Sequence, residues 1–190
     1  MSRVAHFDCF AGICGSMVLG ALLDVGLELE DLQRELERLE LREFRLERER
    51  VREQGSAGSR LRVLCDEGHT HRNLRDIENI LDRAGLAPRV RANAGRVFRL
   101  LAEADAKGHD RVLYQIHFHE VGAVDAIVDI TGAAIGLELL GIEAVSASAV
   151  NTGQGMVRCQ HGLMPVPAPA TAELLREIPS YSSGIEKELA

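Results

Sequence analysis

Aromatic residues are scarce in this chain of 190 residues, which contains no Trp, two Tyr and five Phe. Proteins that bind single-stranded nucleic acids stack bases on aromatic side chains, so this class of partner is disfavoured. Lysine is also rare, since Lys107 and Lys187 are the only two, and the net charge is −7. An acidic chain offers no broad surface for a polyanion, so we expect no nucleic-acid partner.

Long apolar runs are absent as well, and the amino terminus carries no secretory signal pattern, so we expect no membrane partner and a cytoplasmic protein. The four cysteines are Cys9, Cys14, Cys65 and Cys159, and they form no C-x-x-C pair. In a reducing compartment they are most simply buried thiols, with soft-metal binding by one or two of them as the alternative.

The composition that remains is that of an ordinary folded domain, with 46% apolar and 27% charged residues. Apolar periodicity and glycine or proline boundaries predict helices over residues 17–25, 28–40, 73–84, 88–107 and 124–140 and a last one ending near 177. Extended segments are predicted at 3–10, 43–52, 59–66, 113–119, 143–150 and 156–159. We therefore predict one α/β or α+β domain over 1–190, a mixed sheet of short strands covered by about five to six helices.

A glycine loop follows the first predicted strand and precedes the first helix. Asp8 ends the strand, and the loop contains Gly12, Cys14, Gly15 and Ser16. Glycines let a backbone approach an anion, and a helix amino terminus offers free N–H groups, so a phosphate could bind here with a divalent cation on Asp8. The alternative of similar weight is a simple turn in which Ser16 caps the helix.

Two histidine pairs have a spacing that suits a metal ion. His69 and His71 are separated by one residue, and so are His117 and His119, which Glu120 follows. Side chains two apart on an extended chain point to the same side, and imidazole is the commonest ligand of transition metals. The alternative for the first pair is two exposed loop histidines, which we weight above half when that pair is taken alone.

Two further groups could assist such a site. Asp125 and Asp129 are one helical turn apart on a predicted helix, where a carboxylate on an apolar face needs a metal, Arg or His partner, or caps the helix. Cys159 and His161 could chelate a soft metal or pair as nucleophile and base, against the alternative of a strand end with a buried thiol. Nickel, zinc or manganese would suit the combined donors.

Four segments, taken in order, resemble the LarC family of nickel-insertion proteins. They are Phe-Asp-Cys-Phe-Ala-Gly-Ile at 7–13, His-Thr-His-Arg-Asn-Leu at 69–74, His-Phe-His-Glu-Val-Gly-Ala-Val-Asp-Ala-Ile-Val-Asp-Ile at 117–130 and His-Gly-Leu-Met-Pro-Val-Pro-Ala-Pro-Ala-Thr at 161–171. The resemblance covers only the amino-terminal part of that family. The family pattern Gly-Ile-Ser-Gly-Asp-Met reads Gly-Ile-Cys-Gly-Ser-Met here, so Cys14 and Ser16 replace a hydroxyl and an acid.

The resemblance implies a nickel chelatase, a lyase that inserts Ni²⁺ into pyridinium-3,5-bisthiocarboxylic acid mononucleotide to form the nickel-pincer nucleotide of lactate racemase. It implies that the complete protein consumes CTP with Mg²⁺ or Mn²⁺. Expected partners are this mononucleotide, the carboxy-terminal part of the same protein, the lactate racemase apoprotein and, as an open alternative, a second copy of the chain.

The expected roles divide the candidate residues into three groups. The candidates for the base are Glu120, Asp125 and Asp129; those for the phosphate are Asp8, Gly12, Cys14, Gly15 and Ser16; and those for nickel are His69, His71, His117, His119, Glu120, Cys159 and His161. Two other functions remain open at this point: a nickel-binding module without catalysis, and a metal-dependent phosphohydrolase built on Asp8 and the glycine loop.

Overall fold

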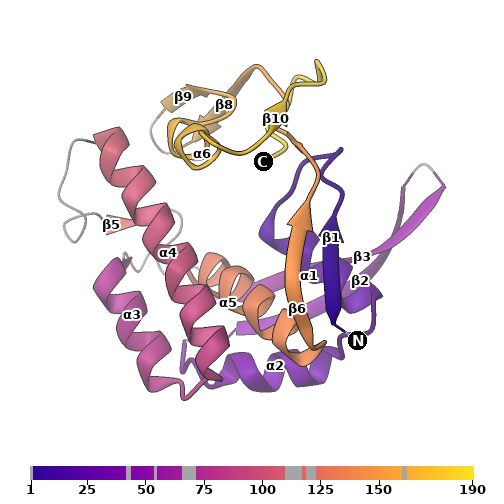
Figure 1. Ribbon diagram of the computed structural model, residues 1–190, viewed down its shortest axis with the longest axis vertical. Coiled ribbons are helices and arrows are strands. Elements are labelled where there is room, and N and C mark those ends of the chain that lie inside the picture. The colour runs from indigo at the N-terminus through magenta and orange to yellow at the C-terminus, as the bar shows by residue number, and fades with distance from the viewer. Residues whose placement is uncertain are drawn as a thin grey trace. The chain divides into compact units, whose positions relative to one another are not determined.

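The computed structural model describes residues 2–41, 44–53, 55–65, 72–109, 117–118, 123–159 and 162–190. Along the chain (Figure 1) its elements are β1 (Arg3–Phe7), α1 (Gly15–Asp24), α2 (Leu29–Glu37), β2 (Phe44–Glu53), β3 (Ser56–Cys65), β4 (Arg72–Asn73), α3 (Leu74–Arg83), α4 (Pro88–His109), β5 (His117–Phe118), α5 (Val124–Leu139), β6 (Ile142–Ala147), β7 (Val150–Asn151), β8 (Met156–Cys159), β9 (Gly162–Pro165), α6 (Pro169–Leu174) and β10 (Ser180–Tyr181). The six helices and short strands of the described residues confirm the predicted fold class.

The strands form small sheets instead of one continuous sheet. In the described residues, β1 pairs with β6 and β7 with β10 in parallel, whereas β2–β3, β4–β5 and β8–β9 are antiparallel pairs. By its contacts the chain divides into two compact units that each combine separated segments. Unit 1 contains residues 1–14, 100–116 and 142–190, and unit 2 contains 15–99 and 117–141. The prediction of a single domain stays a prediction.

Unit 2 is built on helices that bury leucine and isoleucine at helical spacing. In α2, Leu32 and Leu36 are four residues apart and both are fully buried, while the charged residues between them face outward. In α3, Leu74, Ile77 and Leu81 follow the same rule. This helix also begins with a capping box, because Asn73 accepts from the backbone N–H of Asp76 and the Asp76 carboxylate accepts from that of Asn73.

Close packing of α5 against α1 fixes the geometry of unit 2. A Cβ atom added to Gly132 would lie 3.2 Å from Leu19 Cδ2, and one added to Gly136 would lie 2.9 Å from Leu22 Cδ1. The two glycines therefore allow the helices to approach. The residue of α1 in contact moves from Leu19 to Leu22 as the residue of α5 moves from Gly132 to Gly136. The helices α1 and α5 therefore run parallel, with their amino termini at the same end.

Unit 1 depends on hydrogen bonds around one buried amide. Asn151 is 1% exposed. Its Nδ2 donates to the Phe10 carbonyl at 2.7 Å and to Ser183 Oγ at 2.9 Å. Its Oδ1 accepts from the backbone N–H groups of Gly153 and Ser183 at 3.2 and 3.3 Å. One side chain thus joins three segments that are far apart in the sequence.

The carboxy-terminal segment of the chain lies against the glycine loop of unit 1. The N–H of Ile13 donates to the Leu189 carbonyl at 2.8 Å, and the N–H of Leu189 donates to the Thr152 carbonyl at 3.1 Å. Gly12 has φ +85°, and a Cβ atom there would overlap the Leu189 carbonyl. Glycine is therefore required at this position for the segment to pass.

Most predicted elements are present, with differences at their ends. The last helix stops at Leu174, earlier than predicted, and the strand predicted at 3–10 stops at Phe7. The strand β9 pairs with β8 and ends at Pro165, a position where the missing N–H is tolerated. Of the predicted strand at 113–119, only 117–118 fall within the described residues, where they form β5. Among described helices, none has the length and apolar character of a membrane span.

Candidate functional site

The residues that directly follow the first histidine pair in the sequence lie beside His117 in unit 2. The short strand β4 begins directly after His71, and β5 begins at His117. The two strands pair antiparallel, with Arg72 opposite Phe118 and Asn73 opposite His117. The backbone therefore brings Arg72 and Asn73 beside His117 and Phe118, which are more than forty residues away in the sequence.

Many of the predicted nickel ligands cannot be placed. His69, His71, His119, Glu120 and His161 lie outside the described residues. The backbones of His117 and Cys159 belong to β5 and β8, but their side chains are not described. In the described part of the chain, no group of three His, Cys, Asp or Glu side chains could hold a metal ion. The metal-ligand assignment stays a prediction.

The carboxylate of Asp129 lies against the first turn of α1. A Cβ atom added to Gly15 would lie 2.5 Å from Asp129 Oδ2 and 2.6 Å from Asp129 Cβ. Only glycine accommodates the carboxylate at this distance. Together with the close approach of α5 to α1, this contact holds Asp129 in one position.

Asp129 combines burial with a carboxylate oxygen that is left unpaired by the described residues. Its Oδ1 atom is buried and has no hydrogen-bond partner among them. Burial, followed by the negative charge of Asp125, raises the pKa of Asp129 to about 6. Asp125, in the first turn of α5, is exposed, and its Oδ1 accepts from the backbone N–H of Ala126 at 2.8 Å. Asp129 is thus a basic carboxylate held in the interior.

Close packing explains both glycines of the predicted phosphate loop. Gly12 makes room for Leu189, and Gly15 makes room for Asp129. The negative charge that a helix amino terminus favours is already supplied to α1 by Asp129. Ser16 is the second residue of α1 and does not occupy the cap position that we expected. Anion binding by this loop stays a prediction, and an anion at Gly15 would meet a carboxylate.

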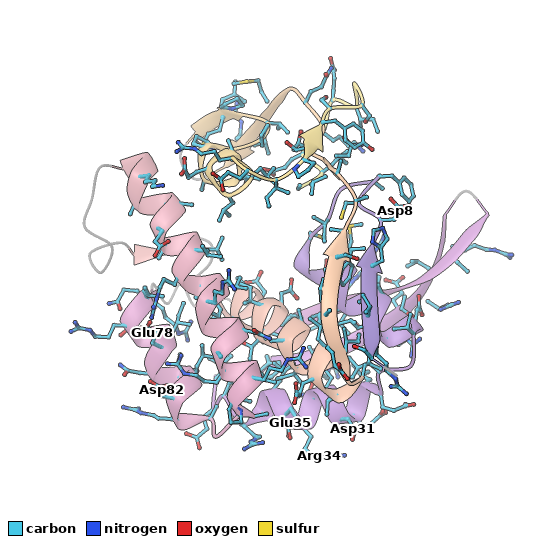
Figure 2. All side chains as sticks on the ribbon, viewed as in Figure 1. Asp8, Asp31, Arg34, Glu35, Glu78 and Asp82 are labelled. Carbon is cyan, nitrogen blue, oxygen red and sulfur yellow. The ribbon has the colours of Figure 1, made fainter. Side chains whose placement is uncertain are left out.

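The structure adds His6 of β1, which the sequence patterns did not single out, to the candidate Asp8. His6 lies opposite Ser146 of β6, and its Nδ1 lies 2.9 Å from Ser146 Oγ. Asp8 follows at the end of β1, where Figure 2 labels it. His6 and Asp8 have the same one-residue separation as the two histidine pairs. A search for mixed His and Asp pairs with this spacing would have found them.

Comparison with known proteins identifies the family. The nickel insertion protein family matches residues 5–190. The chain belongs to this family. One relative comes from Desulfitobacterium hafniense (strain DSM 10664 / DCB-2) and is named pyridinium-3,5-bisthiocarboxylic acid mononucleotide nickel insertion protein. It is 51% identical over 188 residues, which cover 99% of this chain and 47% of the relative.

Two other relatives carry the nickel insertion name. The protein of Geobacter sp. (strain M21) is 51% identical over 93% of this chain, and that of Dictyoglomus thermophilum is 40% identical over 98%. These alignments cover 46% and 48% of the two relatives, so the chain spans about half the length of the nickel insertion proteins it matches. No solved structure matches this chain.

Proposed function

We propose that this chain is the nickel- and substrate-binding part of a nickel insertase for pyridinium-3,5-bisthiocarboxylic acid mononucleotide. The observation that carries the proposal is the match to the nickel insertion family over residues 5–190. The complete enzyme is then a lyase that consumes CTP with Mg²⁺ or Mn²⁺ and produces the cofactor of lactate racemase. The lactate racemase apoprotein, the carboxy-terminal part of the protein and a second copy are its proposed partners.

In this proposal the two histidine segments receive Ni²⁺. Pairing of β4 with β5 supports it, because it places the residues next to His71 beside His117. Imidazole ligands suit a divalent first-row metal, and neighbouring carboxylates such as Glu120 adjust its charge. The ion is substrate here, so the ligands have to release it once the sulfur atoms of the mononucleotide are in position.

Asp129 is the proposed base. When the carbon–nickel bond forms, the C–H bond at that ring carbon breaks, its electron pair goes to the new bond, and its proton must leave. A carboxylate with a pKa of about 6 accepts a proton more readily than an ordinary Asp and is still ionised at pH 7. Gly15 keeps this carboxylate in one orientation, while Asp125 raises its basicity.

Binding and turnover test the proposal together. The purified chain and the Desulfitobacterium hafniense relative are each titrated with Ni²⁺ and with the mononucleotide by calorimetry. Each is then incubated with both ligands, CTP and Mg²⁺, and the nickel-bound nucleotide is detected by mass. We expect this chain to bind both ligands. Failure to bind either one, under conditions in which the relative binds both, contradicts the proposal.

Matched variants assign the residues. The double change His117→Ala and His119→Ala should remove most nickel binding, whereas His109→Ala, outside both pairs, should leave it unchanged. If the complete protein is assayed, Asp129→Asn should slow insertion by about 100-fold with nickel binding retained. Asp125→Asn should have a smaller effect, since it only lowers the pKa of Asp129. Equal rates for Asp129→Asn and the unchanged protein would exclude this base.

A further inference from the structure

The carboxyl end of β1 presents an imidazole and a carboxylate on the same side of an extended chain. His6 and Asp8 are two residues apart, and side chains at this spacing point to one side of a strand. Both are exposed. Neither the imidazole Nε2 nor the Asp8 carboxylate forms a hydrogen bond or ion pair with another described residue. His6 is the penultimate residue of β1 and Asp8 is the first residue after it, and exposure alternates from His6 through Phe7 to Asp8 as it does on an extended chain.

Ser146 binds one nitrogen of the His6 ring and leaves the other without a partner among the described residues. Its Oγ lies 2.9 Å from His6 Nδ1 and 3.5 Å from the Ala5 carbonyl oxygen. In the tautomer that protonates Nδ1, His6 Nδ1–H donates to Ser146 Oγ and Nε2 retains its lone pair. Hydrogen bonding of the other ring nitrogen is the usual way a metal-binding histidine is oriented.

We propose that His6 Nε2 and an oxygen of Asp8 bind a divalent first-row transition metal ion. The choice of nickel rests on the proposed function, but the site itself does not. Imidazole favours such metals over Mg²⁺, and two protein ligands leave several positions for water or for donor atoms of an incoming molecule. Metal held this way exchanges readily, which suits a site that receives an ion and passes it on. It belongs to unit 1, whereas the β4–β5 histidines belong to unit 2.

Nickel titration of the chain tests the site without any need for turnover. The experiment uses the His117→Ala, His119→Ala variant as background, so that the unit 2 ligands do not dominate the signal. In this background we expect one remaining equivalent of Ni²⁺. His6→Gln should remove it, and Asp8→Asn should weaken it at least tenfold. In an NMR spectrum, substoichiometric Ni²⁺ should broaden the resonances of His6 and Ser146 first.

Three controls keep the result interpretable. Ser146→Ala retains both ligands and should weaken binding by about tenfold, as loss of an orienting partner does. Circular dichroism checks that each variant is folded, which exposed positions should permit. A hundredfold excess of Mg²⁺ should leave nickel bound. Unchanged nickel affinity in both His6→Gln and Asp8→Asn, or displacement by Mg²⁺, overturns the site, and neither result bears on insertion by the unit 2 residues.

Discussion

Different interactions stabilise the interior of each of the two units. In unit 2, α1, α2 and α5 pack through leucines and glycines, and this packing sets the position of Asp129 against Gly15. In unit 1, short strands are joined by the hydrogen bonds of Asn151, and many apolar side chains remain exposed, such as Phe10 at 67% and Leu163 at 62%. The proposed base, Asp129, and the proposed ligand His117 belong to the unit with the packed core, whereas the proposed His6–Asp8 site belongs to the more open unit 1.

The largest effect should come from the leucine core of unit 2. Leu36 is fully buried, so Leu36→Ala should lower the free energy of unfolding by about 3 kcal/mol, through lost apolar burial and the cavity that remains. Leu64→Ala is the control, because Leu64 is 38% exposed and should cost less than about 1 kcal/mol. Urea unfolding followed by circular dichroism measures both. Equal losses would show that unit 2 does not depend on this core.

The corresponding change in unit 1 is Asn151→Ala. It leaves the Phe10 carbonyl and the N–H groups of Gly153 and Ser183 without their partner. We expect a loss of about 2 kcal/mol, below that of the leucine change. Hydrogen exchange should show faster opening of 150–153 with little change in α1 or α5. Ser182→Ala, which removes one exposed hydrogen bond to Gln154, is the control.

A double-mutant cycle tests the contact between Gly15 and Asp129. Gly15→Ala places a methyl group 2.5 Å from Asp129 Oδ2, so we expect a loss of about 1.5 kcal/mol as the helices shift. The same change in an Asp129→Ala background should cost less than half as much, because the obstructing carboxylate is gone. Additive losses in thermal unfolding would mean that the two residues do not touch.

The smallest effect concerns pH. Because the pKa of Asp129 is raised from 3.8 to about 6, the folded state binds the proton more tightly than the unfolded state. Its contribution to stability is therefore present at low pH and is lost as pH rises from about 4 to 6. Asp129→Asn should remove this dependence and stabilise the fold at pH 7. Asp125→Asn should shift the loss to lower pH. If the stability of Asp129→Asn changed with pH in the same way as that of the unchanged protein, this would contradict the assignment.

The helices were predictable because their signals are local. Buried positions in α2 and α3 recur at helical spacing, and glycine follows α1, α3 and α5 within two residues of their last position. The sheets were less predictable, since β1 pairs with β6 across more than 130 residues and no sequence pattern encodes such a pairing.

In the candidate site, too, local features were predictable from the sequence and long-range contacts were not. The spacing of Asp125 and Asp129 predicted that they share a helical face, but not which would become basic, because that depends on α1 packing over one of them. Glycines 12 and 15 suggested a phosphate loop, and their close neighbours, Leu189 and Asp129, became evident only in three dimensions. The role of Ser146 in orienting His6 likewise needed the strand register.

The contact between Ile13 and Leu189 also has a consequence for the order in which the chain folds during synthesis. All pairings of unit 2 lie within residues 15–141, so this unit can close while the rest is still being translated. Unit 1 needs Leu189 beside the loop that follows β1. Its first strand leaves the ribosome early, and β1 has an unpaired edge until its partner β6 has been translated.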